Sequence, residues 1–128
     1  NDNLVTLTSI TSAGNVIIAF WASYCAPCKK EIPQLVELKK KYQVSKRIGL
    51  LLINIDKEGR EKALPFIESL GITDTCLIDR YQVNAKKYIP KLKIPAVFLV
   101  NTKGFIVFKA SGENTQNLAN LEKAIQRL

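Results

Sequence analysis

Two cysteines separated by two residues, Cys25 and Cys28, lie where a continuous apolar run gives way to a helical pattern. The run covers residues 15–22 and is rich in β-branched and aromatic side chains, as is typical of a strand buried on both faces. In residues 25–42 apolar residues recur at helical spacing with lysines on the outer side, and Pro33 within this pattern predicts a kink. The cysteines are therefore predicted to open a helix directly after a central strand.

The remaining patterns continue the alternation of strands and helices and end in a hairpin. Early alternation followed by a hairpin predicts an α/β fold, with a central mixed sheet and helices on both of its faces. A length of 128 residues predicts one domain, residues 1–128. The predicted strands are 15–22, 48–55, 76–78, 96–101 and 105–109, and the predicted helices are 25–42, 59–70, 82–92 and 115–128. The helix over 82–92 is weaker and is limited by Pro90.

The composition excludes several kinds of chemistry. The chain has no histidine, which removes Ser-His-Asp and Cys-His mechanisms and every histidine-ligated metal site. Its three cysteines are too few for a disulfide-rich scaffold. The net charge of +8 suggests weak attraction to anionic partners, but no nucleic-acid-binding motif accompanies it, and an ordinary solvated basic surface is favoured.

The position of each cysteine in the predicted helix assigns it a role. Unpaired N–H groups and partial positive charge at a helix N-terminus stabilise a thiolate, so the pKa of Cys25 is expected to fall below the free value of about 8.5. Cys25 is therefore expected to be the exposed nucleophile. Cys28 lies one turn further in, where it is expected to be more buried and to resolve the mixed disulfide that Cys25 forms. Pro27 fits the first turn because no N–H is needed there.

Three other interpretations of the cysteine pair are open. A zinc site needs four cysteine or histidine ligands, and the chain offers at most three. A purely structural disulfide is the second interpretation, although so short a loop removes little entropy from the unfolded state. Two inert buried thiols are the third. The strand–cysteine–helix context favours a redox pair over all of them.

Residues 20–29, Phe-Trp-Ala-Ser-Tyr-Cys-Ala-Pro-Cys-Lys, resemble the active-site segment of the thioredoxin superfamily. Pro33 matches the helix-kinking proline of that family, and Ile94-Pro95 resembles its cis-proline loop. The resemblance covers residues 16–128 and implies a thioredoxin-like fold. It also implies that Pro95 faces the cysteine pair and that the neighbouring backbone, at Ile94, binds the substrate chain.

Two further segments narrow the resemblance. Residues 28–33, Cys-Lys-Lys-Glu-Ile-Pro, and residues 98–104, Phe-Leu-Val-Asn-Thr-Lys-Gly, are similar to the TlpA/ResA-like branch, the extracytoplasmic thiol–disulfide oxidoreductases of bacteria. Members of this branch reduce disulfides outside the cytoplasm, including those of apocytochrome c, and are usually tethered or exported. The resemblance therefore implies such an activity and such a location for this chain.

The chain departs from ordinary thioredoxins on the strand before the motif. Ala19 occupies the place of a buried aspartate that helps to move a proton from the buried cysteine. Glu31 is the candidate replacement, because it lies three residues after Cys28 and partial burial would raise its pKa. An exposed glutamate paired with a lysine is the alternative. Trp21 is expected to pack beneath the pair as a hydrophobic wall of the substrate-binding region.

Two other features stand apart from the motif. Residues 80–93 hold five basic residues and no acidic one. This favours an ordinary solvated surface, with a preference for acidic partners as the alternative. Cys76 stands alone in the sequence and is expected to be a buried free thiol, with a redox or regulatory role as the alternative.

These features predict an enzyme, a thiol–disulfide oxidoreductase that reduces protein disulfides through Cys25 and Cys28. A disulfide oxidant or isomerase of the same fold is the alternative, and a peroxidase of the peroxiredoxin type or a non-catalytic binding module ranks lower. The expected partners are a disulfide-containing protein substrate and a recharging redox partner such as a membrane thiol donor, with no nucleic acid. The chain is expected to be a monomer, and no metal or organic cofactor is implied.

The expected location is periplasmic or otherwise extracytoplasmic. No apolar run reaches the roughly 18–20 residues that span a bilayer. The first residues, Asn1-Asp2-Asn3, carry neither a signal peptide nor an initiator methionine. A signal or membrane anchor removed from a longer precursor is compatible with this expectation.

Overall fold

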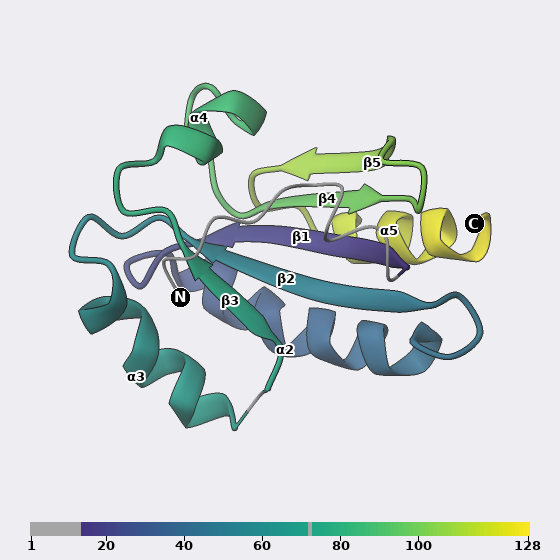
Figure 1. Cartoon of the computed structure of the whole chain (residues 1–128), viewed down its shortest axis with the longest axis horizontal. Helices are drawn as coiled ribbons and strands as arrows, with labels where there is room; N and C mark the ends of the chain where they lie inside the picture. Colours follow the sequence, from purple (N-terminus) through teal and green to yellow (C-terminus); the bar gives the residue numbers. More distant parts are fainter. Residues whose placement is uncertain (1–13, 72) are drawn as a thin grey trace.

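The computed structural model describes residues 14–71 and 73–128, and within them five strands form one sheet. The strands are β1 (Asn15–Trp21), β2 (Ile48–Asn54), β3 (Thr75–Ile78), β4 (Ala96–Val100) and β5 (Ile106–Ser111). Their order is β3-β2-β1-β4-β5 (Figure 1). β2 runs parallel to both β1 and β3, whereas β4 runs antiparallel to β1 and to β5. The prediction of a mixed sheet is confirmed.

Helices of the described segments cover both faces of this sheet. They are α2 (Ala26–Tyr42), α3 (Arg60–Leu70), α4 (Val83–Tyr88) and α5 (Asn117–Gln126). Phe20 and Trp21 are consecutive in β1, so their side chains point to opposite faces. Phe20 packs against Tyr88 of α4 with ring centroids 6.0 Å apart, and Trp21 packs against Phe66 of α3 at 5.2 Å. α3 and α4 therefore lie on opposite faces, as predicted.

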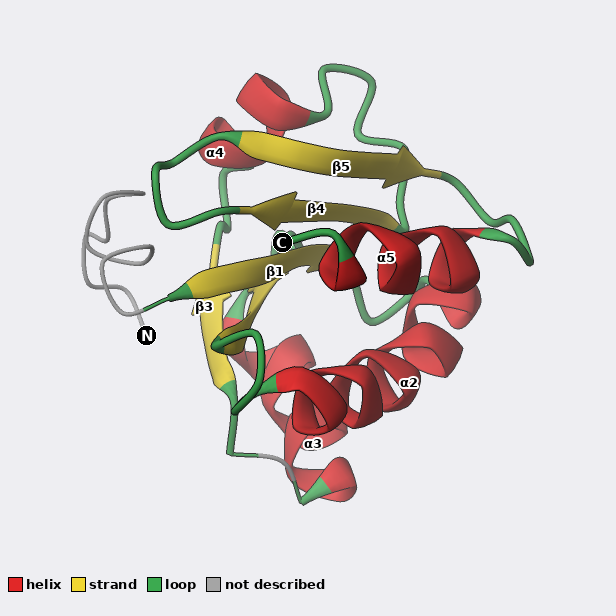
Figure 2. Ribbon diagram, turned by 90° about the vertical axis from the view of Figure 1, so that its right-hand side faces the viewer, coloured by secondary structure: helices red, strands yellow, loops and turns green. Residues whose placement is uncertain are grey.

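α2 and α5 share the face of α3, as the turned view in Figure 2 shows. The Lys29 ammonium of α2 lies over the ring of Phe66 in α3, 5.4 Å from its centroid. Further along α2, Lys41 forms a 2.7 Å ion pair with Glu122 of α5. One face of the sheet thus carries three helices, and the short α4 packs on the other.

The central strands β1 and β4 form the middle of the core. Every residue of β4 is buried, and so is every residue of β1 after Asn15. Burying one large apolar side chain contributes about 1.5–3 kcal/mol, so these strands give the end of β1 a rigid base. The chain leaves β1 at Trp21 and enters α2 five residues later. In the described part of the chain, no helix combines the length and apolarity that crossing a bilayer requires.

The helix predicted for residues 82–92 is shorter in the structure, where α4 begins at Val83 and ends at Tyr88. Ile89 already has a non-helical backbone, with φ −132° and ψ 79°. Pro90 follows it, and a residue before proline is disfavoured in the helical region. The proline therefore stops the helix earlier than the apolar pattern suggests.

The last strand also differs, since it was predicted over residues 105–109 and β5 covers Ile106–Ser111. The side-chain oxygen of Asn101 accepts hydrogen bonds from the backbone N–H groups of Lys103 and Phe105, both at 3.0 Å. These bonds keep the backbone up to Phe105 in the turn, so the strand begins one residue later.

Candidate active site

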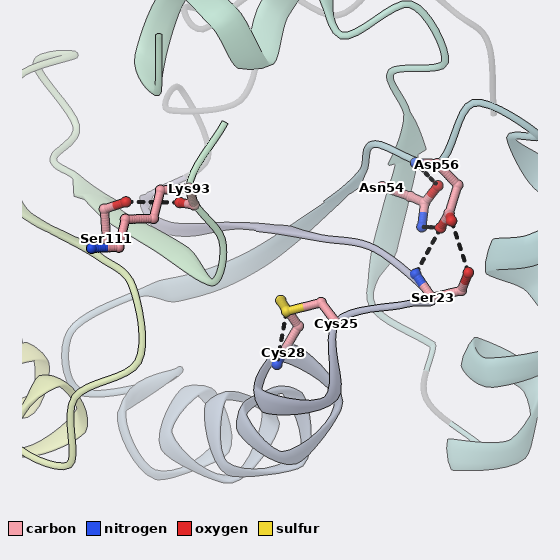
Figure 3. Close-up of a disulfide and its surroundings, with 7 residues drawn as sticks. All are labelled: Ser23, Cys25, Cys28, Asn54, Asp56, Lys93 and Ser111. Carbon is pink, nitrogen blue, oxygen red and sulfur yellow. Dashed lines mark hydrogen bonds between the residues drawn. A yellow bond between two sulfur atoms is a disulfide. The ribbon is translucent and has the colours of Figure 1, made fainter. Parts of the chain in front are cut away.

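The two cysteines lie at the start of α2 and are joined by a disulfide with Cα atoms 5.3 Å apart. Cys25 is the N-cap residue, with an extended backbone, and its Sγ accepts a hydrogen bond from the backbone N–H of Cys28 at 3.3 Å (Figure 3). Cys25 is 8% exposed and Cys28 is 1% exposed. The predicted placement is confirmed, with the outer cysteine among the helix N–H groups and the inner one more buried. The expectation that Cys25 is exposed is not met, because the whole residue is buried in this oxidised state.

The local sequence explains why the helix begins at this point. The backbone N–H of Cys25 bonds back to the carbonyl of Ala22 at 3.0 Å, which closes a turn after β1. Pro27 occupies the first turn of α2, where its missing N–H costs nothing. The N–H of Lys29 then reaches the carbonyl of Cys25 at 3.2 Å and begins the regular helix. The first-turn N–H groups are thus left free to face a sulfur.

A buried carboxylate holds the loop that precedes the cysteines. Asp56, only 2% exposed, accepts hydrogen bonds from the backbone N–H of Ser23 at 2.8 Å and from its hydroxyl at 2.7 Å (Figure 3). The side-chain amide of the fully buried Asn54 donates to the same carboxylate at 2.8 Å. Ser23 lies two residues before Cys25, so these bonds fix the path of the chain into α2. The group Ser23, Asn54 and Asp56 is called the Asp56 cluster below.

No motif in the sequence links Asp56 to the cysteine pair, and the sequence prediction missed it. Ser23 and Asp56 are 33 residues apart. They meet because Trp21 pairs with Asn54 at the ends of the parallel strands β1 and β2. The usable signal is a polar residue directly after a buried strand, since parallel neighbours end at the same edge of a sheet.

The loop before β4 flanks the disulfide from the other side. The peptide bond between Ile94 and Pro95 is cis, as the resemblance implied. The carbonyl of Pro95 accepts the N–H of Gly112 at 2.7 Å, and the hydroxyl of Ser111 donates to the carbonyl of Lys93 at 2.7 Å. In Figure 3 the disulfide lies between the Asp56 cluster and the pair formed by Lys93 and Ser111. Pro95 is buried and Ile94 is half-buried.

Trp21 lies in the interior, 1% exposed, against the ring of Phe66. Phe66 also contacts Lys29, the residue after Cys28, whose ammonium lies over the Phe66 ring. So deep a position suits a hydrophobic wall beneath the cysteines. It does not suit direct contact between Trp21 and a substrate, because almost none of the side chain is accessible.

Cys76 in β3 is a free, half-buried thiol. Burial raises the pKa of Cys76, and the nearby indole N–H of Trp21 offsets this rise only in part. That indole nitrogen has no hydrogen-bond partner within normal distance among the residues described. A thiol with a raised pKa is protonated at neutral pH and is a poor nucleophile. This environment suits a structural cysteine.

Residues 1–109 match the AhpC/TSA family, which is most of the chain. The chain belongs to the AhpC/TSA family. Among curated members of similar sequence, the thiol–disulfide oxidoreductase ResA of Bacillus subtilis is 26% identical over 92% of this chain and 64% of its own length. This AhpC/TSA chain spans between 52% and 64% of the length of the curated relatives it matches.

Solved structures agree with the thioredoxin-like fold that the sequence predicted. StoA from Bacillus subtilis superposes with a TM-score of 0.68 and 25% identity, covering 88% of this chain and 83% of StoA. A thioredoxin-like protein from Porphyromonas gingivalis superposes with a TM-score of 0.75 and 28% identity, covering 91% and 76% of the two chains. The predicted similarity to the ResA-like branch is confirmed by these relatives.

Glu31 lies on α2, one turn after Cys28, and is half-buried. Burial raises the pKa of Glu31 from 4.5 to about 7. No ion pair within the described residues joins Glu31 to a lysine. A carboxyl group with a pKa near neutrality can both take up and release a proton under ordinary conditions.

Replacing Glu31 with glutamine should remove one source of pH dependence from stability. In wild-type protein the unfolded carboxyl ionises near pH 4.5 and the folded one near 7, so stability from this group is full below pH 4.5 and falls as pH rises to 7. The unfolding free energy of wild type, measured relative to that of Glu31→Gln, should therefore decrease as the pH rises from about 4.5 to about 7. Urea unfolding of the oxidised proteins from pH 4 to 8 measures it.

Glu37→Gln is the matched control for this experiment. Glu37 lies on the same helix, is exposed, and has only a 3.7 Å contact with Lys40. Its substitution should leave the shape of the stability–pH curve as in wild type. Parallel curves for wild type and Glu31→Gln would contradict the raised pKa.

Proposed function

We propose that this chain is a thiol–disulfide oxidoreductase that reduces disulfides in protein substrates through Cys25 and Cys28. The observation that carries the proposal is the geometry of the pair. The N-cap sulfur of Cys25 accepts the N–H of Cys28 at 3.3 Å, and the two sulfurs already form a disulfide. The names of relatives such as ResA, a thiol–disulfide oxidoreductase, support the same reaction class.

The reaction begins with the Cys25 thiolate of the reduced protein. It attacks one sulfur of the substrate disulfide, forms a mixed disulfide, and releases the other substrate sulfur as a thiolate that takes up a proton. Cys28 then loses its proton and attacks the Cys25 sulfur. This second exchange releases the remaining substrate thiol and leaves the Cys25–Cys28 disulfide, so two electrons have passed to the substrate. A dithiol donor, such as a membrane thiol protein, returns two electrons and two protons.

The other predicted site residues take supporting roles in this proposal. Glu31 accepts the proton of Cys28 during the second exchange, which its raised pKa of about 7 supports. The backbone at Ile94 and Pro95 binds the substrate chain beside the disulfide. Trp21 forms the wall beneath the pair and keeps Cys28 in a dry environment.

A glutathione redox titration tests this function and its direction. A reversible two-electron transition of the pair is expected, with a reduction potential of about −250 mV or lower for a reductant. A value near −120 mV would instead identify a disulfide oxidant. Absence of any reversible transition would overturn the proposal of a redox enzyme.

We further propose that the chain works outside the cytoplasm, in the periplasm or its equivalent, and that cytochrome c maturation is among its pathways. The similarity to ResA and StoA and the ResA-like segments 28–33 and 98–104 support this location. Labelling of Cys25 in intact cells by a membrane-impermeant thiol reagent would test it. Labelling only after lysis would contradict it.

A further inference from the structure

A pocket of about 470 Å³ opens beside the loop that carries Pro95. Its walls come from the end of α4, from the segment that leads to Pro95, and from β4 and β5. Tyr88, Ile89 and Phe98 contribute the apolar floor, and Lys91, Lys93 and Lys109 form the rim. These six residues are called the basic pocket below.

The floor of the basic pocket is aromatic and rigid. The rings of Tyr88 and Phe98 meet edge to face with centroids 5.7 Å apart, and Phe20 of β1 packs beneath Phe98 at 5.9 Å. Phe98 is 4% exposed, so the core fixes its position. Concave apolar surfaces of this kind accept an aromatic or aliphatic side chain of a ligand.

The rim of the basic pocket carries positive charge that nothing nearby neutralises. Lys91, Lys93 and Lys109 are exposed, no carboxylate lines the pocket, and no ion pair among residues 14–71 and 73–128 includes any of the three. By contrast, Lys39 and Lys41 of α2 have carboxylate partners at 2.8 and 2.7 Å. Three unpaired cations around an apolar floor complement a ligand that carries carboxylates beside an apolar side chain.

The basic pocket is continuous with the loop that carries Pro95. The carbonyl of Lys93, two residues before Pro95, accepts the hydroxyl of Ser111, which also lines the pocket. The N–H of Gly112, the residue after Ser111, donates to the carbonyl of Pro95 at 2.7 Å, so these pocket residues are bonded to the cis-proline loop. A substrate chain that binds along the backbone of Ile94 and Pro95, as proposed above, can therefore extend into the pocket.

We propose that the basic pocket binds an acidic segment of the disulfide-bearing protein substrate. One apolar side chain of the segment lies on Tyr88, which Phe98 supports from below, and carboxylates on either side of it face Lys91, Lys93 and Lys109. This inference rests on the proposed function and adds a substrate class to it. An anionic membrane surface is the less suitable ligand, because the apolar floor is concave and a bilayer surface is broad and flat.

The test compares two synthetic peptides of equal length, each with one disulfide and one phenylalanine. Glutamates flank the phenylalanine in the first peptide and glutamines in the second. We expect the reduced protein to have a kcat/KM about 3- to 10-fold higher for the glutamate peptide at low salt, and this ratio should fall as salt is added. The ratio for Lys91→Gln/Lys109→Gln should approach 1, because Lys93 alone remains on the rim.

Lys86→Gln/Lys87→Gln is the matched control, since it removes the same charge from exposed positions of α4 outside the pocket. Its ratio should stay at the wild-type value, and circular dichroism should show both variants folded. Equal kcat/KM for the two peptides in wild type, or an equal fall of the ratio in both variants, would contradict the proposal that the basic pocket binds an acidic segment. Failure to reduce either peptide would instead overturn the proposed function.

Vesicles containing phosphatidylserine distinguish the membrane from the peptide. If the pocket binds an acidic peptide, Lys91→Gln/Lys109→Gln and the control variant should bind these vesicles equally well. If the pocket variant alone lost vesicle binding while the peptide ratio stayed at its wild-type value, the pocket would be a lipid site and the proposal would be wrong.

Discussion

Replacing Cys25 with serine should lower the rate of protein-disulfide reduction on the order of a thousandfold or more, to the uncatalysed background. A serine hydroxyl does not ionise near neutral pH and forms no stable bond to sulfur. The N–H of Cys28 that bonds Cys25 Sγ would then stabilise no thiolate. Turnover of insulin disulfides with dithiothreitol as the electron donor measures the loss.

Cys76→Ser is the matched control for this variant. Cys76 is a free thiol whose pKa is raised by burial, and it forms no disulfide in the structure. Its substitution should leave the turnover rate within about twofold of wild type. Loss of activity in Cys76→Ser together with retention in Cys25→Ser would contradict the assignment of the redox pair.

Replacing Asp56 with alanine should lower the free energy of unfolding by about 2–4 kcal/mol. The substitution removes an acceptor of three hydrogen bonds, two from Ser23 and one from Asn54. The amide of Asn54 is fully buried and would lose this partner. A buried donor without an acceptor lowers the free energy of unfolding by about its desolvation penalty. The loss should therefore exceed that of a substitution at an exposed position. Urea unfolding of the oxidised protein measures it.

Asp79→Ala provides a comparison at a second buried carboxylate. Asp79, 7% exposed, accepts the backbone N–H groups of Ala85 at 2.7 Å and Asn84 at 3.4 Å, as a helix cap would. Loss of such a cap costs about 1 kcal/mol. Asp56→Ala should therefore be the more destabilising of the two. An equal or smaller loss for Asp56→Ala would show that the Asp56 cluster does not hold the loop.

The parts of the site that local chemistry determines could be predicted from the sequence. The buried strand up to Trp21, the helix that begins after Cys25 and the proline in its first turn are all read from neighbouring residues. The same holds for the burial order of Cys25 and Cys28, because one helical turn separates them. The position of the cis bond before Pro95 followed from family resemblance rather than from a local signal.

The parts that depend on tertiary contacts could not be predicted in this way. Asp56 meets Ser23 across 33 residues only because two parallel strands end together. The basic stretch 80–93 was interpreted as an ordinary surface, and only the pairing of β4 with β5 brings Lys109 to the same pocket as Lys91. Pro90 does indicate from the sequence that the helix over residues 82–92 is limited, but not that α4 ends at Tyr88, two residues before the proline.

The identity of the attacking sulfur can be read directly from a trapped reaction. Reduced Cys28→Ser protein should be mixed with a disulfide-bonded protein substrate, quenched with acid and mapped by mass spectrometry under non-reducing conditions. A stable mixed disulfide between the substrate and Cys25 is expected, because Cys28 is no longer present to resolve it. A substrate bonded to Cys76, or no adduct at Cys25 under conditions in which wild type turns over, would contradict this expectation.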